Sequence, residues 1–218
     1  MAEPGEGDSG AAALSQAVSQ QLGRLLAAPL PAGLFLVATP IGNLADITLR
    51  ALAVLVTADL VYCEDTRQSQ KLLDRYGIRR GMRSYHEHNG EQERPRILAA
   101  LAEGRSVALI SDAGTPLVSD PGFKLVREAA AGGYAVTAVP GPSAVLTALS
   151  VGGLPTDSFH FAGFLPARQG QRRERIQMLS DLSATLVLFE APQRLGEALD
   201  DLFSILGNRP AAIARELT

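Results

Sequence analysis

Residues 106–123 read SVALISDAGTPLVSDPGF, and this stretch decides the fold class. It begins with an apolar run, 107–110, of the length and β-branched character of a buried parallel strand. The run ends at 111–116, where the residues tolerate unusual backbone angles or carry short polar groups. Asp120 and Pro121 are typical of a helix N-cap and first helical position. The stretch predicts a strand, a polar turn and a helix. Such turns bind ligands in open α/β sheets, although an ordinary strand-to-helix connection remains the alternative.

Length and composition narrow the class of protein. The chain has 218 residues, of which 46% are hydrophobic and 20% charged, as in ordinary soluble globular proteins of one or two domains. No apolar run approaches about 18 residues, so no membrane span is expected. The single cysteine, Cys63, is expected in the core and excludes an intramolecular disulfide or a cysteine zinc site, so a reducing cytoplasm fits best. A net charge of −3 argues against nucleic-acid binding over the whole surface but leaves room for a local basic patch.

The N-terminal segment, residues 1–32, is small, polar and alanine-rich. Residues 5–10 match the pattern G-x-G-x-x-G, but no strand can precede them, so a dinucleotide site is not expected there. A transient helix over 11–28 is possible on composition. We expect this segment to be disordered.

From Gly33 onward, expected strands and helices alternate. Strands are expected at 34–38, 60–63, 107–110 and 135–139, and helices at 47–56 (capped by Asp46), 66–76, 91–102, 121–131 and 144–151. This alternation predicts an α/β domain over 33–151 with a mostly parallel sheet. A glycine- and proline-containing linker at 152–155 separates it from a second α/β domain, 156–218. There we expect strands at 159–164, 185–189 and 211–214 and helices at 172–182 and 192–206, with too few residues to complete a sheet.

Three expected strands end in turns that contain glycine and proline, at 39–44, 111–116 and 139–144. Glycine lets the backbone approach a ligand closely, and proline fixes the turn before the following helix. Free N–H groups at the helix starts can hold a carboxylate or a hydroxyl. The three turns together predict a ligand pocket.

Several motifs in this chain closely resemble one known family. They are TPIGNLADIT (39–48), CEDTR (63–67), SDAGTPLVSDPG (111–122), PGPSA (140–144), FEAPQR (189–194) and ARELT (214–218). The family is bacterial small-subunit ribosomal RNA methyltransferase I, a cytidine 2′-O-methyltransferase branch of the tetrapyrrole methylase superfamily, and the resemblance covers 33–218. It implies two α/β domains with S-adenosylmethionine in the cleft between them, a cytoplasmic homodimer, and 16S ribosomal RNA of the small subunit as substrate. Because the family continues past ARELT with strands that complete the second domain, 156–218 is expected to be incomplete.

The resemblance also implies which residues contact the methyl donor, with Asp46 near the same cleft. They are Pro40, Gly42, Asn43, Ser111, Asp112, Ala113, Gly114, Thr115, Pro116, Pro140, Gly141, Pro142, Ser143, Ala144, Glu190 and Ala191. Asp112 is a candidate partner for ribose hydroxyls or for the methionine amino group. For Gly141 and Pro142, turn geometry alone is the alternative explanation.

Glu64, Asp65 and Arg67 leave the end of an expected buried strand. Two carboxylates beside an arginine are costly there without a role. A 2′-hydroxyl loses its proton as the methyl group arrives, so we assign Glu64 as the general base, Arg67 as a phosphate or carboxylate partner, and Asp65 as a helix cap. A purely structural alternative, in which Arg67 pairs with Glu64, stays open.

A basic cluster is formed by Arg168, Arg172, Arg173 and Arg175, and guanidinium groups suit RNA phosphate. A solvated helix face is the alternative. His86 and His88 do not complete a usual metal site, and methyl transfer needs no metal, so a solvated or RNA-facing loop is expected.

Other functions were weighed against RNA methylation. Methylation of a porphyrinoid carbon would suit the superfamily, but the SDAGTP motif and the arginine cluster argue against it. In a dinucleotide-dependent oxidoreductase, Glu64 would lie 22 residues after Gly42, about where an acidic residue is needed, yet the first turn has a single glycine. A non-catalytic RNA-binding or assembly module is the third alternative.

Overall fold

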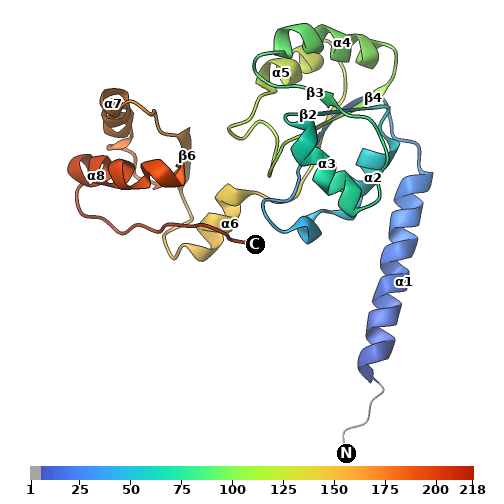
Figure 1. Cartoon of the computed structure of the whole chain (residues 1–218), viewed down its shortest axis with the longest axis horizontal. Coiled ribbons are helices and arrows are strands. Elements are labelled where there is room, and N and C mark those ends of the chain that lie inside the picture. Colours follow the sequence, from blue (N-terminus) through green and yellow to red (C-terminus); the bar gives the residue numbers. More distant parts are fainter. Residues whose placement is uncertain (1–5) are drawn as a thin grey trace, which may run out of the picture. The chain divides into compact units, whose positions relative to one another are not determined.

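The computed structural model describes residues 6–218, with side chains from residue 9 onward. The chain forms two compact units, Met1–Pro142 and Ser143–Thr218 (Figure 1). The boundary therefore precedes helix α6, Ala144–Val151, which the sequence assigned to the first domain. A Cβ added to Gly152, just after α6, would lie 3.6 Å from the Cβ of Ala212, so the end of this helix packs within the second unit.

A five-stranded sheet with the order β3-β2-β4-β1-β5 lies at the centre of the first unit. The strands are β1 (Gly33–Val37), β2 (Leu60–Cys63), β3 (Arg83–Ser84), β4 (Ser106–Ile110) and β5 (Val136–Val139). Every pairing is parallel, which confirms the predicted sheet type. Strand β3 was not predicted, because two residues are too few to produce a periodic signal.

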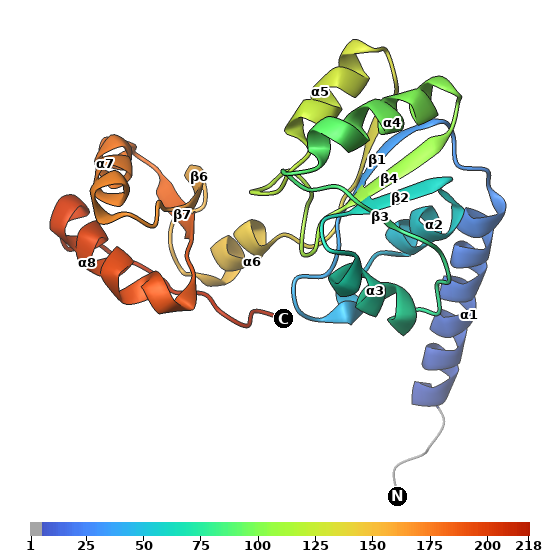
Figure 2. The same cartoon turned by 45° about the horizontal axis from the view of Figure 1, so that its top comes forward.

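Helices cover both faces of this sheet (Figure 2). They are α2 (Leu49–Thr57), α3 (Thr66–Arg75), α4 (Gly90–Ala102) and α5 (Phe123–Ala131). Side chains of β4 alternate between the two cores: Ala108 and Ile110 pack with α2 and α3, whereas Val107 and Leu109 pack with α4 and α5. All five residues of β4 are buried, as the apolar run predicted.

Of the three predicted helix N-caps, those at Asp46 and Asp120 are wrong. Thr48, not Asp46, caps α2 by accepting a hydrogen bond from the Ala51 N–H, because Asp46 belongs to a 3-10 turn, Leu44–Asp46. Helix α5 begins at Phe123 rather than at Pro121, because the preceding Gly122 has a φ of +134° that is incompatible with a helix. The third start is confirmed, since the Asp65 side chain caps α3.

Residues 6–27 form a helix, α1 (Glu6–Ala27), so the expectation of disorder is wrong for this part of the segment 1–32. Alanine-rich sequences favour helix, and Leu22 and Leu30 pack against the core cluster that contains α2. Residues 1–5, including Gly5 of the discarded glycine pattern, lie outside the described residues. Across 6–218, none of the helices combines the length and the apolar character needed to cross a membrane.

The second unit contains a two-stranded parallel sheet and helices. After α6 come β6 (Phe159–Phe164), α7 (Gln169–Leu179), β7 (Thr185–Phe189), a 3-10 turn (Pro192–Arg194) and α8 (Leu195–Leu206). Its small core includes Leu165, Ile176 and Ala198. The strand predicted at 211–214 is absent, because nothing in the described part of the chain pairs with these residues and a strand requires such a partner.

Candidate functional site

The three predicted turns lie together at the carboxyl edge of the five-stranded sheet, after β1, β4 and β5. Thr39 and Gly114 exchange two backbone hydrogen bonds, with N···O distances of 2.9 and 3.0 Å. The Thr39 hydroxyl also donates to the Ser111 carbonyl at 2.9 Å, and the Thr115 hydroxyl donates to the Pro142 carbonyl at 3.2 Å. The turns therefore form one connected surface.

Two positions in these turns favour glycine, one through its backbone angle and one through close packing. Gly114 has a φ of +82°, and a Cβ added there would lie 3.4 Å from Cγ2 of Ile41. At Gly141, where φ is ordinary, an added Cβ would lie 3.1 Å from the Cβ of Ala38. Packing against the end of β1 thus explains Gly141, which favours turn geometry at this position.

The loop between β4 and α5 is strained. Leu117 and Ser119 have φ values of 72° and 65°, a region that costs a side-chain-bearing residue roughly 1–2 kcal/mol. The Ser111 hydroxyl holds the loop by donating to the Ala113 carbonyl at 2.9 Å and by contacting the Asp120 carboxylate. Such strain concentrates at ligand sites.

Carboxylates gather where β2 and β4 end, and two of them lack cationic partners among the described side chains. Burial raises the pKa of Glu64, and the negative charges of Asp120, Asp112 and Asp65 raise it further. Burial also raises the pKa of Asp120. The hydrogen bond from Ser111 lowers this pKa, and the negative charge of Asp112 raises it. Within residues 9–218, neither Glu64 nor Asp120 forms an ion pair, and no acidic or histidine group is arranged to hold a metal ion.

Asp65 and Arg67 interact with each other at this edge. Asp65 Oδ1 accepts from the Arg67 N–H at 2.8 Å, and Oδ2 pairs with Arg67 Nη2 at 3.0 Å. The alternative pairing of Arg67 with Glu64 is therefore wrong. The Asp65 backbone N–H donates to Asp112 Oδ1 at 2.9 Å, which connects the ends of β2 and β4. The Arg67 side chain is 90% exposed.

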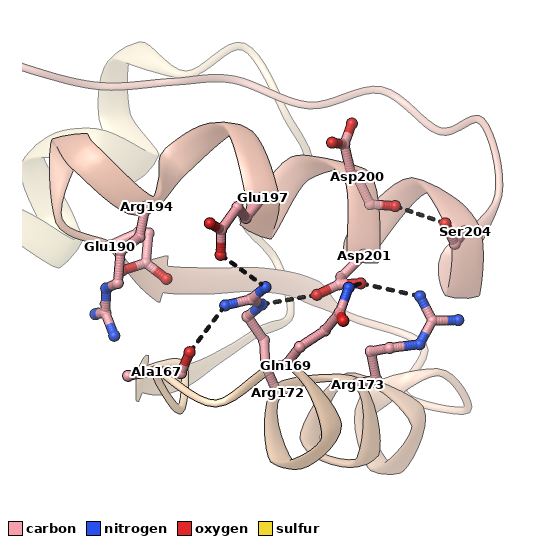
Figure 3. Close-up of polar contacts among 10 residues, drawn as sticks. All are labelled: Ala167, Gln169, Arg172, Arg173, Glu190, Arg194, Glu197, Asp200, Asp201 and Ser204. Carbon is pink, nitrogen blue, oxygen red and sulfur yellow. Dashed lines mark hydrogen bonds and ion pairs between the residues drawn. The ribbon is translucent and has the colours of Figure 1, made fainter.

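Two arginines of the basic cluster, Arg172 and Arg173, point toward Asp201 of α8 (Figure 3). Arg172 is 1% exposed, and its Nε donates to Asp201 Oδ2 at 2.7 Å, so its assignment to RNA is wrong. The reason is helical periodicity, because Arg172 shares the buried face of α7 with Ile176 and Leu179. Arg173 also pairs with Asp201, at 2.9 Å, although its side chain is 45% exposed.

Two members of the basic cluster, Arg168 and Arg175, are not engaged by a carboxylate among the described side chains. Arg168 is exposed and Arg175 half-exposed, and neither forms an ion pair with any residue whose side chain is described. Their assignment to RNA stays a prediction.

Glu190 follows β7 and is nearly buried, with a side chain 8% exposed. Its Oε1 accepts from the Ala191 N–H at 2.8 Å and pairs with Arg194, whereas its buried Oε2 has no hydrogen-bond partner among the described residues. The expected donor contacts Ser143, Ala144, Glu190 and Ala191 belong to the second unit, and Ser143 caps α6. The remaining expected contacts belong to the first unit.

Two residues of the carboxyl edge were missed by the sequence assignments. Thr39 joins the turns, and Asp120 belongs to the acidic cluster rather than to a helix cap. The two Ser-Asp pairs in the stretch 106–123 were the available signal for Asp120. Cys63 is buried, as expected, and burial raises the pKa of its thiol.

Comparisons with known proteins agree with this geometry. The family model "Tetrapyrrole (Corrin/Porphyrin) Methylases" matches residues 33–218. A "Ribosomal RNA small subunit methyltransferase I" of Mesorhizobium japonicum is 61% identical over 193 residues, which cover 88% of this chain and 66% of the relative. A relative of the same name in Halalkalibacterium halodurans is 51% identical over 185 residues, covering 85% and 64%.

Solved structures show the same fold. The crystal structure of uroporphyrin-III-C-methyltransferase from Thermus thermophilus matches with a TM-score of 0.56 and 25% identity, covering 79% of this chain and 73% of that one. The chain spans about two thirds of the length of the curated relatives. The family model matches most of the chain, and the two relatives are 61% and 51% identical to it. The chain belongs to the tetrapyrrole methylase family, with ribosomal RNA small subunit methyltransferase I as its group of relatives.

Proposed function

We propose that this chain is part of an enzyme that transfers a methyl group from S-adenosylmethionine to the 2′-oxygen of a cytidine in 16S ribosomal RNA. The relatives' names support small-subunit RNA as the substrate, and the motif resemblance supports the cytidine 2′-oxygen. The observation that carries the proposal is the pair of uncompensated carboxylates, Glu64 and Asp120, beside the glycine turns. Such an enzyme acts in the bacterial cytoplasm, where the small subunit is assembled.

The residues of the first unit fit a cationic donor. Gly114 has a φ of +82°, a backbone conformation that side-chain-bearing residues rarely adopt, and Asp112 Oδ2 is not used by the hydrogen bond from Asp65. Uncompensated carboxylates attract a positively charged ligand. When bound, S-adenosylmethionine supplies a methyl group on a positively charged sulfur. The chain's own contribution is then to hold the acceptor ribose in line with that methyl group, which is worth several kcal/mol of the barrier, roughly 7–11 at most.

Glu64 is the residue we assign to the acceptor's proton. Its raised pKa makes it a stronger base than an ordinary carboxylate, and it uses no hydrogen bond within the described part of the chain. In the proposed step, the 2′-oxygen would form a bond to the methyl carbon as the bond from that carbon to the donor's sulfur breaks. Glu64 would take the hydroxyl proton, and the donor would leave as a neutral thioether. We assign the exposed Arg67 to RNA phosphate near the acceptor.

Methyl transfer tests the proposed function directly. The full chain is incubated with methyl-labelled S-adenosylmethionine and either naked 16S RNA or assembled small subunits, and the RNA is digested to nucleosides. The expected product is labelled 2′-O-methylcytidine. Label on another nucleoside would correct the target, and RNA binding without transfer would favour an assembly module.

The oligomeric state is proposed from the resemblance as well. We infer a homodimer. Light scattering of the purified chain is expected to give twice the 23.0 kDa of one chain. A mass equal to one chain at micromolar concentration would remove the dimer from the proposal.

A further inference from the structure

The segment His86-Glu87-His88-Asn89, directly after β3, is a fixed turn rather than a solvated loop. The Asn89 side chain accepts from the His86 N–H at 2.8 Å and donates to the Ser84 carbonyl at 2.9 Å. The Gly90 N–H donates to the His86 carbonyl at 2.9 Å. These bonds hold the His86 backbone from both sides.

The His86 side chain contains a polar atom without a partner. Its Nδ1 is buried and forms no hydrogen bond with any of the described residues, although the ring as a whole is only half-buried. Buried polar atoms in proteins are almost always hydrogen-bonded. A buried ring nitrogen without a partner, on a residue whose backbone is fixed by hydrogen bonds, therefore points to a ligand group that completes it.

The turn lies at the same edge of the sheet as the carboxylates. Ser84 of β3 pairs with Cys63 of β2, and the Tyr85 N–H donates to the Cys63 carbonyl at 2.8 Å. His86 thus follows β3 where Glu64 and Asp65 follow β2. Neighbouring strands are about 4.8 Å apart, so β3 ends roughly 10 Å from the end of β4. The glycine turns follow β4, β1 and β5, so the ends of β2 and β3 remain for the acceptor nucleotide.

We propose that His86 binds the acceptor nucleotide, with Nδ1 hydrogen-bonded to a polar atom of its base or ribose while the 2′-hydroxyl faces Glu64. This inference rests on the proposed function, since it assigns a partner to the same edge. An imidazole nitrogen can donate or accept, so it can pair with either kind of group on a nucleotide. His86 would then hold the acceptor rather than the donor.

Three variants of the full chain separate this role from a structural one. His86→Leu removes the polar atom, His86→Asn keeps a polar atom near the position of Nδ1, and His88→Gln alters the exposed neighbouring histidine as a control. With 16S RNA and saturating donor, His86→Leu is expected to weaken RNA binding or slow transfer at least tenfold while the Kd for the donor stays unchanged. His86→Asn should recover most of the activity, and His88→Gln should stay within twofold of wild type. An equal defect in the Leu and Asn variants, or none in either, overturns the inference.

Nitrogen-15 NMR of histidine-labelled protein provides a readout that does not require turnover. The chain has three histidines, His86, His88 and His160, so the ring signals can be assigned with single variants. On addition of a short oligocytidine RNA, the Nδ1 signal of His86 is expected to shift more than those of the other two. An unmoved His86 signal with RNA bound overturns the inference and leaves the proposed function standing. A wild-type chain that neither binds nor methylates 16S RNA overturns the proposed function and this inference with it.

Discussion

Each unit of this protein contains a group of charged side chains, and the two groups differ in how their charge is balanced. In the second unit, Asp201 is buried, yet hydrogen bonds from Arg172 and Arg173 outweigh the effect of burial and lower its pKa. In the first unit, Glu64 and Asp120 contact no cation among the described side chains, and burial raises the pKa of both. Ion pairs with Asp201 join α7 to α8. The carboxylates of the first unit have no such partner, and a bound cationic ligand could supply one.

The comparison predicts its largest effect at Glu64. Replacing a general base costs about 100-fold or more in rate, so Glu64→Gln is expected to lose at least that factor in single-turnover methyl transfer. Its melting temperature should stay the same or rise, because the change removes a charge that burial disfavours. Glu103→Gln, an exposed carboxylate far from the carboxyl edge, provides the control. Wild-type turnover in Glu64→Gln, or unfolding as its first defect, would make this carboxylate structural.

The next largest effect concerns the glycine turns. Gly114 and Gly104 have similar φ values, +82° and +75°, so alanine at either should cost about 1–2 kcal/mol of stability. At Gly104 an added Cβ meets no atom within 4 Å, whereas at Gly114 it enters the connected turns. Gly114→Ala alone is therefore expected to weaken donor binding about tenfold in calorimetry, which corresponds to roughly 1.4 kcal/mol. Equal donor affinity in the two variants would move the donor away from these turns.

The two charged groups should respond to acid in opposite directions. Asp201 has a lowered pKa, so its contribution to stability is present above 3.8, the ordinary value, and is lost as pH falls through the lowered folded value. Glu64 and Asp120 have raised values, so the folded state takes up protons first and gains stability relative to the unfolded state as pH falls from neutral. At pH 7, Asp201→Asn should lower the free energy of unfolding measured with urea, whereas Asp120→Asn should leave it unchanged or raise it. A decrease of the same size in both variants would end the distinction.

The smallest expected effect belongs to the two arginines of the basic cluster that form no ion pair with described side chains. Neutralising Arg168 and Arg175 together should weaken RNA binding several-fold at low salt. It should also flatten the plot of log affinity against log salt by about 0.7 for each phosphate of single-stranded RNA that an arginine no longer neutralises. Fluorescence anisotropy across a salt series measures the slope. An unaltered slope would assign both side chains to a solvated helix face.

Sequence patterns predicted the parts of this molecule that depend on local chemistry. The apolar run of β4, the alternation of strands and helices and the Asp65 cap all follow from neighbouring residues. The ion pair of Arg172 does not, because its partner Asp201 lies 29 residues away on another helix. The same holds for α1, whose Leu22 packs against a core built from later elements.

At the carboxyl edge of the sheet, too, local sequence predicts the turns but not the contacts between them. The three turns were predicted from glycine and proline, but their mutual hydrogen bonds depend on strand order, which places β1 between β4 and β5. The positive φ values of Leu117 and Ser119, two residues that rarely adopt them, have no signature in the sequence. Nor does the missing partner of His86 Nδ1, which depends on the fold around it.

The contrast between the two charged groups is tested most directly by carbon-13 NMR titration of the side-chain carboxyls in the intact chain. We expect Glu64 to titrate above 4.5 and Asp120 above 3.8, the ordinary pKa values of these groups, and Asp201 to titrate below 3.8. If Glu64 titrates at or below 4.5, or if Asp201 titrates above 3.8, the carboxyl edge is no less balanced than the ion pairs of α7 and α8, and its assignment to methyl transfer loses its physical basis.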